Sequence, residues 1–146
     1  AGADAGGGEM SEPLSRVLGT AERRMQALLQ SLLRAQGVSF AEWVAMTVLQ
    51  GPGGMDRAGL ERVLAAGQVP LEGDVVAGLV TRGWVVEDER LEVTATGRAV
   101  YAPLRGRVAA TLDEIEAGVP EEDLEVARRV LGLVAARAEA ILARGA

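Results

Sequence analysis

The chain has 146 residues, 49% of them hydrophobic, and a formal net charge of −6 at pH 7. This length supports one compact domain, or one domain with long dimerising arms, and the apolar content excludes a chain that is disordered throughout. Because the sequence contains neither cysteine nor histidine, it excludes disulfides, thiol chemistry and the usual zinc sites, so we expect no metal, no cofactor and no redox switch.

The first ten residues, AGADAGGGEM, lack the basic and apolar segments of a signal peptide. Glycine and alanine dominate residues 1–10, so we expect a mobile tail there. No run of about eighteen apolar residues occurs in the sequence, and we therefore expect a cytoplasmic protein that does not cross a membrane. We do not expect an enzyme, because the usual bases and nucleophiles are missing and GPGG lacks the lysine and hydroxyl of a phosphate-binding loop.

Residues 11–36 are predicted to form a long N-terminal dimerisation helix, which Gly37 ends. Apolar side chains recur in this segment at intervals of three and four residues, the spacing of a single helical face. These side chains are Leu14, Val17, Leu18, Ala21, Met25, Leu28, Leu29, Leu32 and Leu33.

Two short helices are predicted to follow. Ser39 and Glu42 have the spacing of a capping box, so a helix should start at Phe40 and end before the breaker GPGG. Asp56 is the expected N-cap of the next helix, which Gly67 ends.

A third short helix is expected to start near Pro70, a residue suited to a first helical turn, and to end at Gly83. The segment WVVEDERLEV then predicts two short strands around Asp88–Arg90. Thr94 should cap the long helix that follows the strands. A last helix should start at the acidic residues after GVP.

This order predicts a mainly α protein. Residues 37–98 should form a winged helix-turn-helix of three short helices and a two-stranded wing, flanked by dimerisation helices in residues 11–36 and 99–146. The long flanking helices carry apolar stripes that so small a unit cannot bury. A second copy of the chain is the economical partner, so we expect a homodimer.

Four local phrases, in this order and spacing, resemble the MarR-type transcriptional regulators. They are GVSFAEWVAMTVL, MDRAGLERVL, LVTRGWV and LEVTATGRAVY, and the resemblance covers residues 14–143. It implies a homodimer whose recognition helices enter major grooves of a palindromic double-stranded DNA, while the wings reach minor grooves. It also implies a small-molecule effector between the dimerisation helices and the DNA-reading domain.

The expected recognition helix departs from this family in its charge. The family usually begins this helix with serines, threonines and arginines, whereas the matching residues here are Pro70, Leu71, Glu72, Gly73 and Asp74. Residues 37–101 hold five arginines against nine acids, a net charge of −4 and the wrong sign for attracting phosphate. An aspartate can still accept a hydrogen bond from a cytosine amino group.

Arginines at the edges of the reading domain are therefore the expected contacts to phosphate and to the minor groove, with a solvated surface as the alternative. The candidate DNA-binding residues are Arg57, Arg62, Pro70, Leu71, Gly73, Asp74, Arg82 and Arg90. The candidate effector-binding residues are Phe40, Trp43 and Met46, for a small apolar or aromatic ligand, with ordinary core packing as the alternative.

Two functions follow from these observations. The first is a MarR-type transcriptional regulator that binds palindromic DNA as a homodimer under the control of a small-molecule effector. The second is a degenerate MarR-like fold that has lost DNA reading and serves as a protein-binding or ligand-binding module. The resemblance favours the first function, and the acidic recognition segment favours the second.

Overall fold

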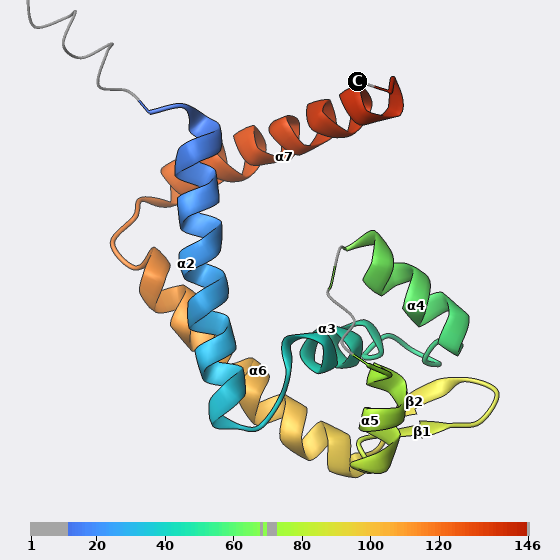
Figure 1. The fold of residues 1–146 in the computed structure, drawn as a ribbon. Coiled ribbons are helices and arrows are strands. Elements are labelled where there is room, and N and C mark those ends of the chain that lie inside the picture. The colour runs from blue at the N-terminus through green and yellow to red at the C-terminus, as the bar shows by residue number, and fades with distance from the viewer. Residues whose placement is uncertain (1–11, 68, 70–72, 146) are drawn as a thin grey trace, which may run out of the picture. The chain divides into compact units, whose positions relative to one another are not determined.

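The computed structural model of the chain describes residues 12–67, 69 and 73–145 (Figure 1). The expected mobile tail and the candidate residues Pro70 and Leu71 lie outside the described residues. The chain divides into two compact units after Val108. The first unit contains a winged helix-turn-helix, as expected from the sequence, and it holds every described candidate residue.

Helix α2 (Leu14–Ala35) lies within the predicted range 11–36, and α3 (Phe40–Val48) starts at Phe40 and ends before GPGG as the sequence predicts. The predicted capping box at the start of α3 is confirmed. The Oγ of Ser39 accepts a hydrogen bond from the Glu42 backbone N–H at 3.1 Å, and the Glu42 carboxylate accepts one from the Ser39 N–H at 2.9 Å. Two orphan donors of the first turn are thereby satisfied, which fixes the turn between α2 and α3.

Helix α4 (Arg57–Ala66) starts at its predicted cap, because the Asp56 carboxylate accepts a hydrogen bond from the Gly59 N–H at 2.9 Å. The predicted start of the third short helix near Pro70 is wrong, because α5 (Val75–Thr81) begins at Val75. Gly73 has a φ of +77°, a left-handed conformation that a right-handed helix cannot contain, and Asp74 is extended. The carboxylate of Asp74 then caps α5 by accepting a hydrogen bond from the Ala77 N–H at 3.0 Å. The aspartate cap, rather than the proline, therefore decides where this helix begins.

The wing is the antiparallel pair β1 (Val85–Glu87) and β2 (Leu91–Val93), which confirms the predicted hairpin around Asp88–Arg90. Met55, just before α4, pairs with Leu91 on β2 through two backbone hydrogen bonds of 2.7 and 3.3 Å. The start of the helix-turn-helix and the wing are thus joined by the backbone itself.

The core of the first unit holds α5 against the rest of the winged helix. Val76 and Leu79 point inward from α5, and Leu79 is fully buried. Side chains from every other element of this unit complete the core. They are Leu33, Val38, Ala45, Met46, Leu49, Leu60, Leu64, Trp84, Val85, Leu91, Tyr101 and Leu104.

Helix α6 (Ala95–Glu116) follows the wing, and Thr94 caps it as predicted by accepting a hydrogen bond from the Gly97 N–H at 3.0 Å. The hydroxyl of Thr94 also donates to the Gly83 carbonyl oxygen at 2.5 Å. In the second unit, α7 (Glu121–Ala143) buries none of its side chains. Apolar side chains along α7 are therefore left exposed, among them Val126, Val130, Leu133 and Ile141.

Replacing Gly97 with alanine should destabilise the fold, whereas the same change at Gly78 should not. A Cβ at position 97 would clash with the backbone oxygen of Trp84, so the start of α6 would have to move, at a cost of roughly 1–3 kcal/mol. At position 78 in α5 the nearest atom, Oε2 of Glu42, would lie at 3.8 Å. Alanine there should stabilise α5 by about 0.5–1 kcal/mol. Urea unfolding of both variants measures the two effects, and a stabilised Gly97→Ala variant would contradict this packing.

Candidate nucleic-acid interface

The candidate interface consists of α4, α5 and the wing. Its ability to attract phosphate depends on whether four arginines are already bonded within the protein. Arg57, Arg62, Arg82 and Arg90 are the arginines that the sequence assigns to DNA. Whether each guanidinium is free to meet a phosphate depends on its partners within the protein.

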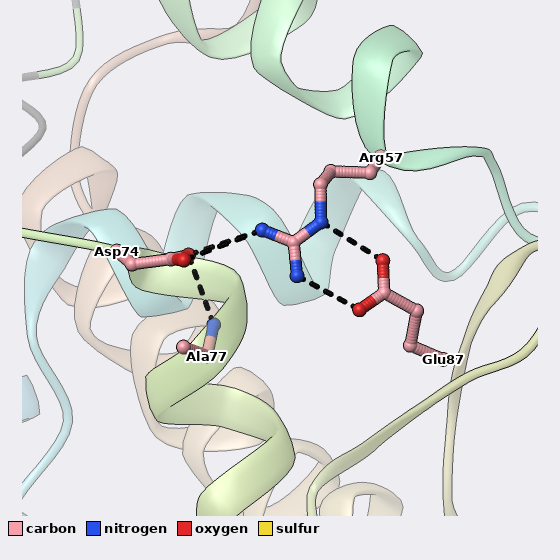
Figure 2. Close-up of polar contacts among 4 residues, drawn as sticks. All are labelled: Arg57, Asp74, Ala77 and Glu87. Atoms are coloured by element: carbon pink, nitrogen blue, oxygen red, sulfur yellow. Dashed lines mark hydrogen bonds and ion pairs between the residues drawn. The ribbon is translucent and has the colours of Figure 1, made fainter.

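Arg57 is held by two carboxylates, as Figure 2 shows. Its Nε and Nη2 donate to the two carboxylate oxygens of Glu87 on β1, at 2.9 and 2.8 Å. Its Nη1 donates to the carboxylate of Asp74 at 3.3 and 3.4 Å. We call Arg57, Asp74 and Glu87 the Arg57 cluster. With one cation and two anions, the cluster carries a net negative charge.

Arg57 favours the charged forms of both carboxylates, and both carboxylates favour the charged form of Arg57. The hydrogen bond from Arg57 lowers the pKa of Glu87, and the nearby charge of Asp74 opposes this effect. The Ala77 N–H lowers the pKa of Asp74 most, followed by the charge of Arg57. The pKa of Arg57 is raised above its ordinary value, chiefly by its hydrogen bond to Glu87. The cluster is therefore fully ionised at neutral pH.

Arg82, the C-cap of α5, is also held inside the protein. Its Nη1 donates to the Gly37 carbonyl oxygen at 2.6 Å, and its Nε forms an ion pair with Glu42 at 3.5 Å. The guanidinium carbon lies 4.4 Å from the ring centroid of Trp84, a cation–π arrangement. We call Arg82, Gly37, Glu42 and Trp84 the Arg82 cluster. It ties the end of α5 to the α2–α3 turn and to the residue before β1.

Arg90 also donates hydrogen bonds within the protein, whereas Arg62 donates none in the described part of the chain. At the wing tip, Arg90 turns back toward the GPGG segment, donating from Nε to the Gly53 carbonyl at 2.7 Å and from Nη2 to the Gly54 carbonyl at 3.0 Å. Arg62 on α4 is exposed and has no hydrogen-bond or ion-pair partner in the described part of the chain. Among the four candidate arginines, Arg62 is thus the one whose donors are all free for a phosphate.

A hollow of about 700 Å³, open to solvent, lies between the end of α2, the start of α3 and α5. Phe40 lines it, together with Val38 and Val75. The other two candidate effector residues do not. Trp43 stacks on Tyr101 with ring centroids 4.9 Å apart, and Met46 is 1% exposed in the core.

The sequence matches no protein-family model and no curated protein. Solved structures do match. A MarR family protein of Mycobacterium tuberculosis in complex with DNA has 21% identity and a TM-score of 0.68, covering 85% of this chain and 98% of its own. A MarR family protein of Bacillus stearothermophilus has 16% identity and a TM-score of 0.70, covering 86% and 93%. CouR of Rhodococcus jostii, bound to p-coumaroyl-CoA, has 18% identity and a TM-score of 0.66, covering 85% and 92%.

The chain has the MarR-type winged-helix fold. In this fold α5 is the helix that the sequence analysis compares with the MarR-type recognition helix, and Asp74 is its N-cap. Gly73 lies just before the helix, in the turn that its positive φ permits. No described helix is long and apolar enough to cross a membrane. Among residues 12–67, 69 and 73–145, no group of three or more acidic side chains is placed to hold a metal ion.

The sequence did not identify the partners that hold the arginines of this MarR-type fold. Glu87 and Arg57 are 30 positions apart, and Gly37 and Arg82 are 45 apart. No local pattern links residues at such separations. The one available signal was the excess of acids in residues 37–101, because arginines in such surroundings find carboxylates close by.

The stability contributed by the Arg57 cluster should be lost in acid. The pKa values of Asp74 and Glu87 in the folded chain lie below their ordinary values of 3.8 and 4.5. As the pH falls, the unfolded chain therefore binds protons first, and the free energy of unfolding decreases. The contribution is complete above the ordinary values and disappears as the pH falls through the folded ones.

The measurement is urea unfolding of the wild type and of the Asp74→Asn/Glu87→Gln double variant, in which asparagine keeps the N-cap. We expect the difference in midpoint to be constant between about pH 7 and pH 6 and to shrink toward about pH 3. A difference that grows on acidification would mean that the two carboxylates are not stabilised by Arg57.

Proposed function

We propose that this chain is a cytoplasmic transcriptional regulator that binds palindromic double-stranded DNA as a homodimer and responds to a small-molecule effector. The observation that carries the proposal is the winged helix-turn-helix, with α4, α5 and the wing in one packed unit. A neighbour that shares this fold was solved in complex with DNA. That likeness supports the proposal by analogy of fold, since function depends on the site.

Exposed apolar stripes support the homodimer. On α2 they include Leu14, Val17, Met25 and Leu28, and α7 buries no side chain. Helix α2 belongs to the first unit and α7 to the second. A second copy of the chain would cover both stripes.

The hollow beside Phe40 is the proposed effector site, because its volume is within the range of small-molecule sites. CouR binds p-coumaroyl-CoA, so a thermal-shift screen should include aromatic acids and their CoA thioesters. A ligand of this site should stabilise the wild type and the Val63→Ala variant on α4, but should stabilise the Phe40→Ala variant much less. Equal stabilisation of all three would place the ligand elsewhere.

A specific observation favours a second candidate function, that of a protein-binding or ligand-binding module without DNA reading. Arg57, Arg82 and Arg90 all donate hydrogen bonds within the protein. The wing tip also carries Asp88 and Glu89 with no ion-pair partner among the described residues. Such a surface repels a phosphate backbone.

DNA binding should be weak, dependent on Arg62, and only mildly sensitive to salt. Because three of the four arginines are engaged, few phosphates can be neutralised, and each contributes about −0.9 to the slope of log K against log salt. Arg62→Ala should weaken binding to every sequence and make that slope less steep by about 0.9. Fluorescence anisotropy on duplexes from the chain's own promoter and of random sequence, at several salt concentrations, measures both quantities.

The matched control is Arg128→Ala on α7, which removes the same charge outside the winged helix. It should change neither affinity nor slope. If the wild type binds neither duplex even at about 50 mM salt, the regulator proposal fails and the binding-module candidate remains.

Assembly should depend on the two apolar stripes. Leu28→Asp on α2 and Leu133→Asp on α7 each place a charge on an exposed apolar face, so either change should convert the homodimer to a monomer while the winged unit stays folded. Val63→Asp, at an exposed position on α4, is the matched control and should leave the dimer intact. Sedimentation measures assembly, and a well-folded wild-type monomer at micromolar concentration would contradict the proposal.

A further inference from the structure

Arg57 lies where three elements of the winged helix meet (Figure 2). It is the first residue of α4, Asp74 caps α5, and Glu87 ends β1. The start of α4 is already joined to the wing by the backbone pairing of Met55 with Leu91. The Arg57 side chain extends that rigid connection to the first turn of α5.

All three nitrogens of the Arg57 guanidinium donate to protein carboxylates. The edge formed by Nε and Nη2 faces Glu87, and Nη1 faces Asp74. A phosphate oxygen would have to compete with these carboxylates for the guanidinium, and their two negative charges would oppose its approach. Arg57 is therefore poorly placed for a phosphate contact, although the sequence assigns it that role.

The same geometry suits a residue that sets the position of α5. A planar guanidinium can bind two carboxylates in fixed directions, which a lysine ammonium cannot do. The carboxylate of Asp74 accepts from Arg57 and from the Ala77 N–H at the same time. Any movement of Arg57 would therefore be transmitted to the first turn of the recognition helix.

We propose that Arg57 is a positioning residue for DNA reading: it holds the first turn of α5 at a fixed place relative to the wing and does not contact phosphate. This inference rests on the proposed function. It predicts that binding to the correct sequence needs the shape of the guanidinium and not merely its positive charge.

Two variants at position 57 separate shape from charge. Arg57→Lys keeps the charge and loses the two-edged geometry, whereas Arg57→Gln loses both. Arg128→Lys and Arg128→Gln on α7 are the matched controls. The readouts are anisotropy on own-promoter and random duplexes at several salt concentrations, the urea unfolding midpoint, and amide hydrogen exchange in α5 and β1 without DNA.

We expect Arg57→Lys to bind the own-promoter duplex about as weakly as Arg57→Gln, each about fivefold below wild type, with the salt slope of Arg57→Lys unchanged. The random duplex should be less affected, and the unfolding midpoint at neutral pH should fall by no more than it does in the Asp74→Asn/Glu87→Gln variant. The Ala77 amide should exchange faster in both Arg57 variants and at the wild-type rate in both Arg128 variants.

Wild-type affinity in Arg57→Lys would overturn the inference, because a charge alone would then suffice. A salt slope made less steep by about 0.9 in Arg57→Lys would overturn it as well, since it would reveal a lost phosphate contact. Equal losses on the own-promoter and random duplexes would overturn it too, because they would show a purely structural role.

Failure of the proposed function has a different signature. If the wild type binds no DNA, the regulator proposal fails, and hydrogen exchange alone then decides whether Arg57 holds α5 to the wing. Unchanged exchange of the Ala77 amide in both Arg57 variants would overturn that connection independently of DNA.

Discussion

Helix α5 has seven residues, a length at which an isolated helix does not persist in water. Its position therefore depends on what holds its two ends. The Arg57 cluster fixes the first turn, and the Arg82 cluster fixes the C-cap to the α2–α3 turn and to Trp84. Between these two anchors, Val76 and Leu79 supply the apolar contact with the core. The position of α5 consequently depends on arginine–carboxylate contacts as much as on core packing.

These anchors explain how an acidic winged helix can be well packed and yet poorly suited to attracting DNA. An arginine that organises the protein needs a carboxylate or carbonyl partner, and each such partner removes donors that a phosphate would use. Arg82 is the clearest case, because its contacts with Glu42, Gly37 and the Trp84 ring all lie within the protein. Selectivity for a DNA sequence at such a winged helix would come from shape and from short-range contacts rather than from long-range attraction.

Most of the fold could be predicted from local sequence patterns, because a helix cap involves residues only three or four positions apart. The Ser39–Glu42 box, the Asp56 cap and the wing hairpin all have the predicted places. The start of α5 was missed because the aspartate cap prevailed over the proline. The site was harder to predict, since the partners of Arg57 and Arg82 come from distant segments, and periodicity cannot tell a cavity wall such as Phe40 from a core side chain such as Met46.

The pairing of Met55 with Leu91 also bears on how the wing behaves at high protein concentration. A two-stranded sheet has two open edges, and each is a template on which a strand of another molecule can add. At Leu91 the outer edge of β2 is already occupied by Met55. The other edge belongs to β1, which is three residues long and ends in the charged Glu87. A short strand and a charge are both features that discourage strand addition, so this hairpin is protected against edge-to-edge aggregation even though Val86 is exposed on it.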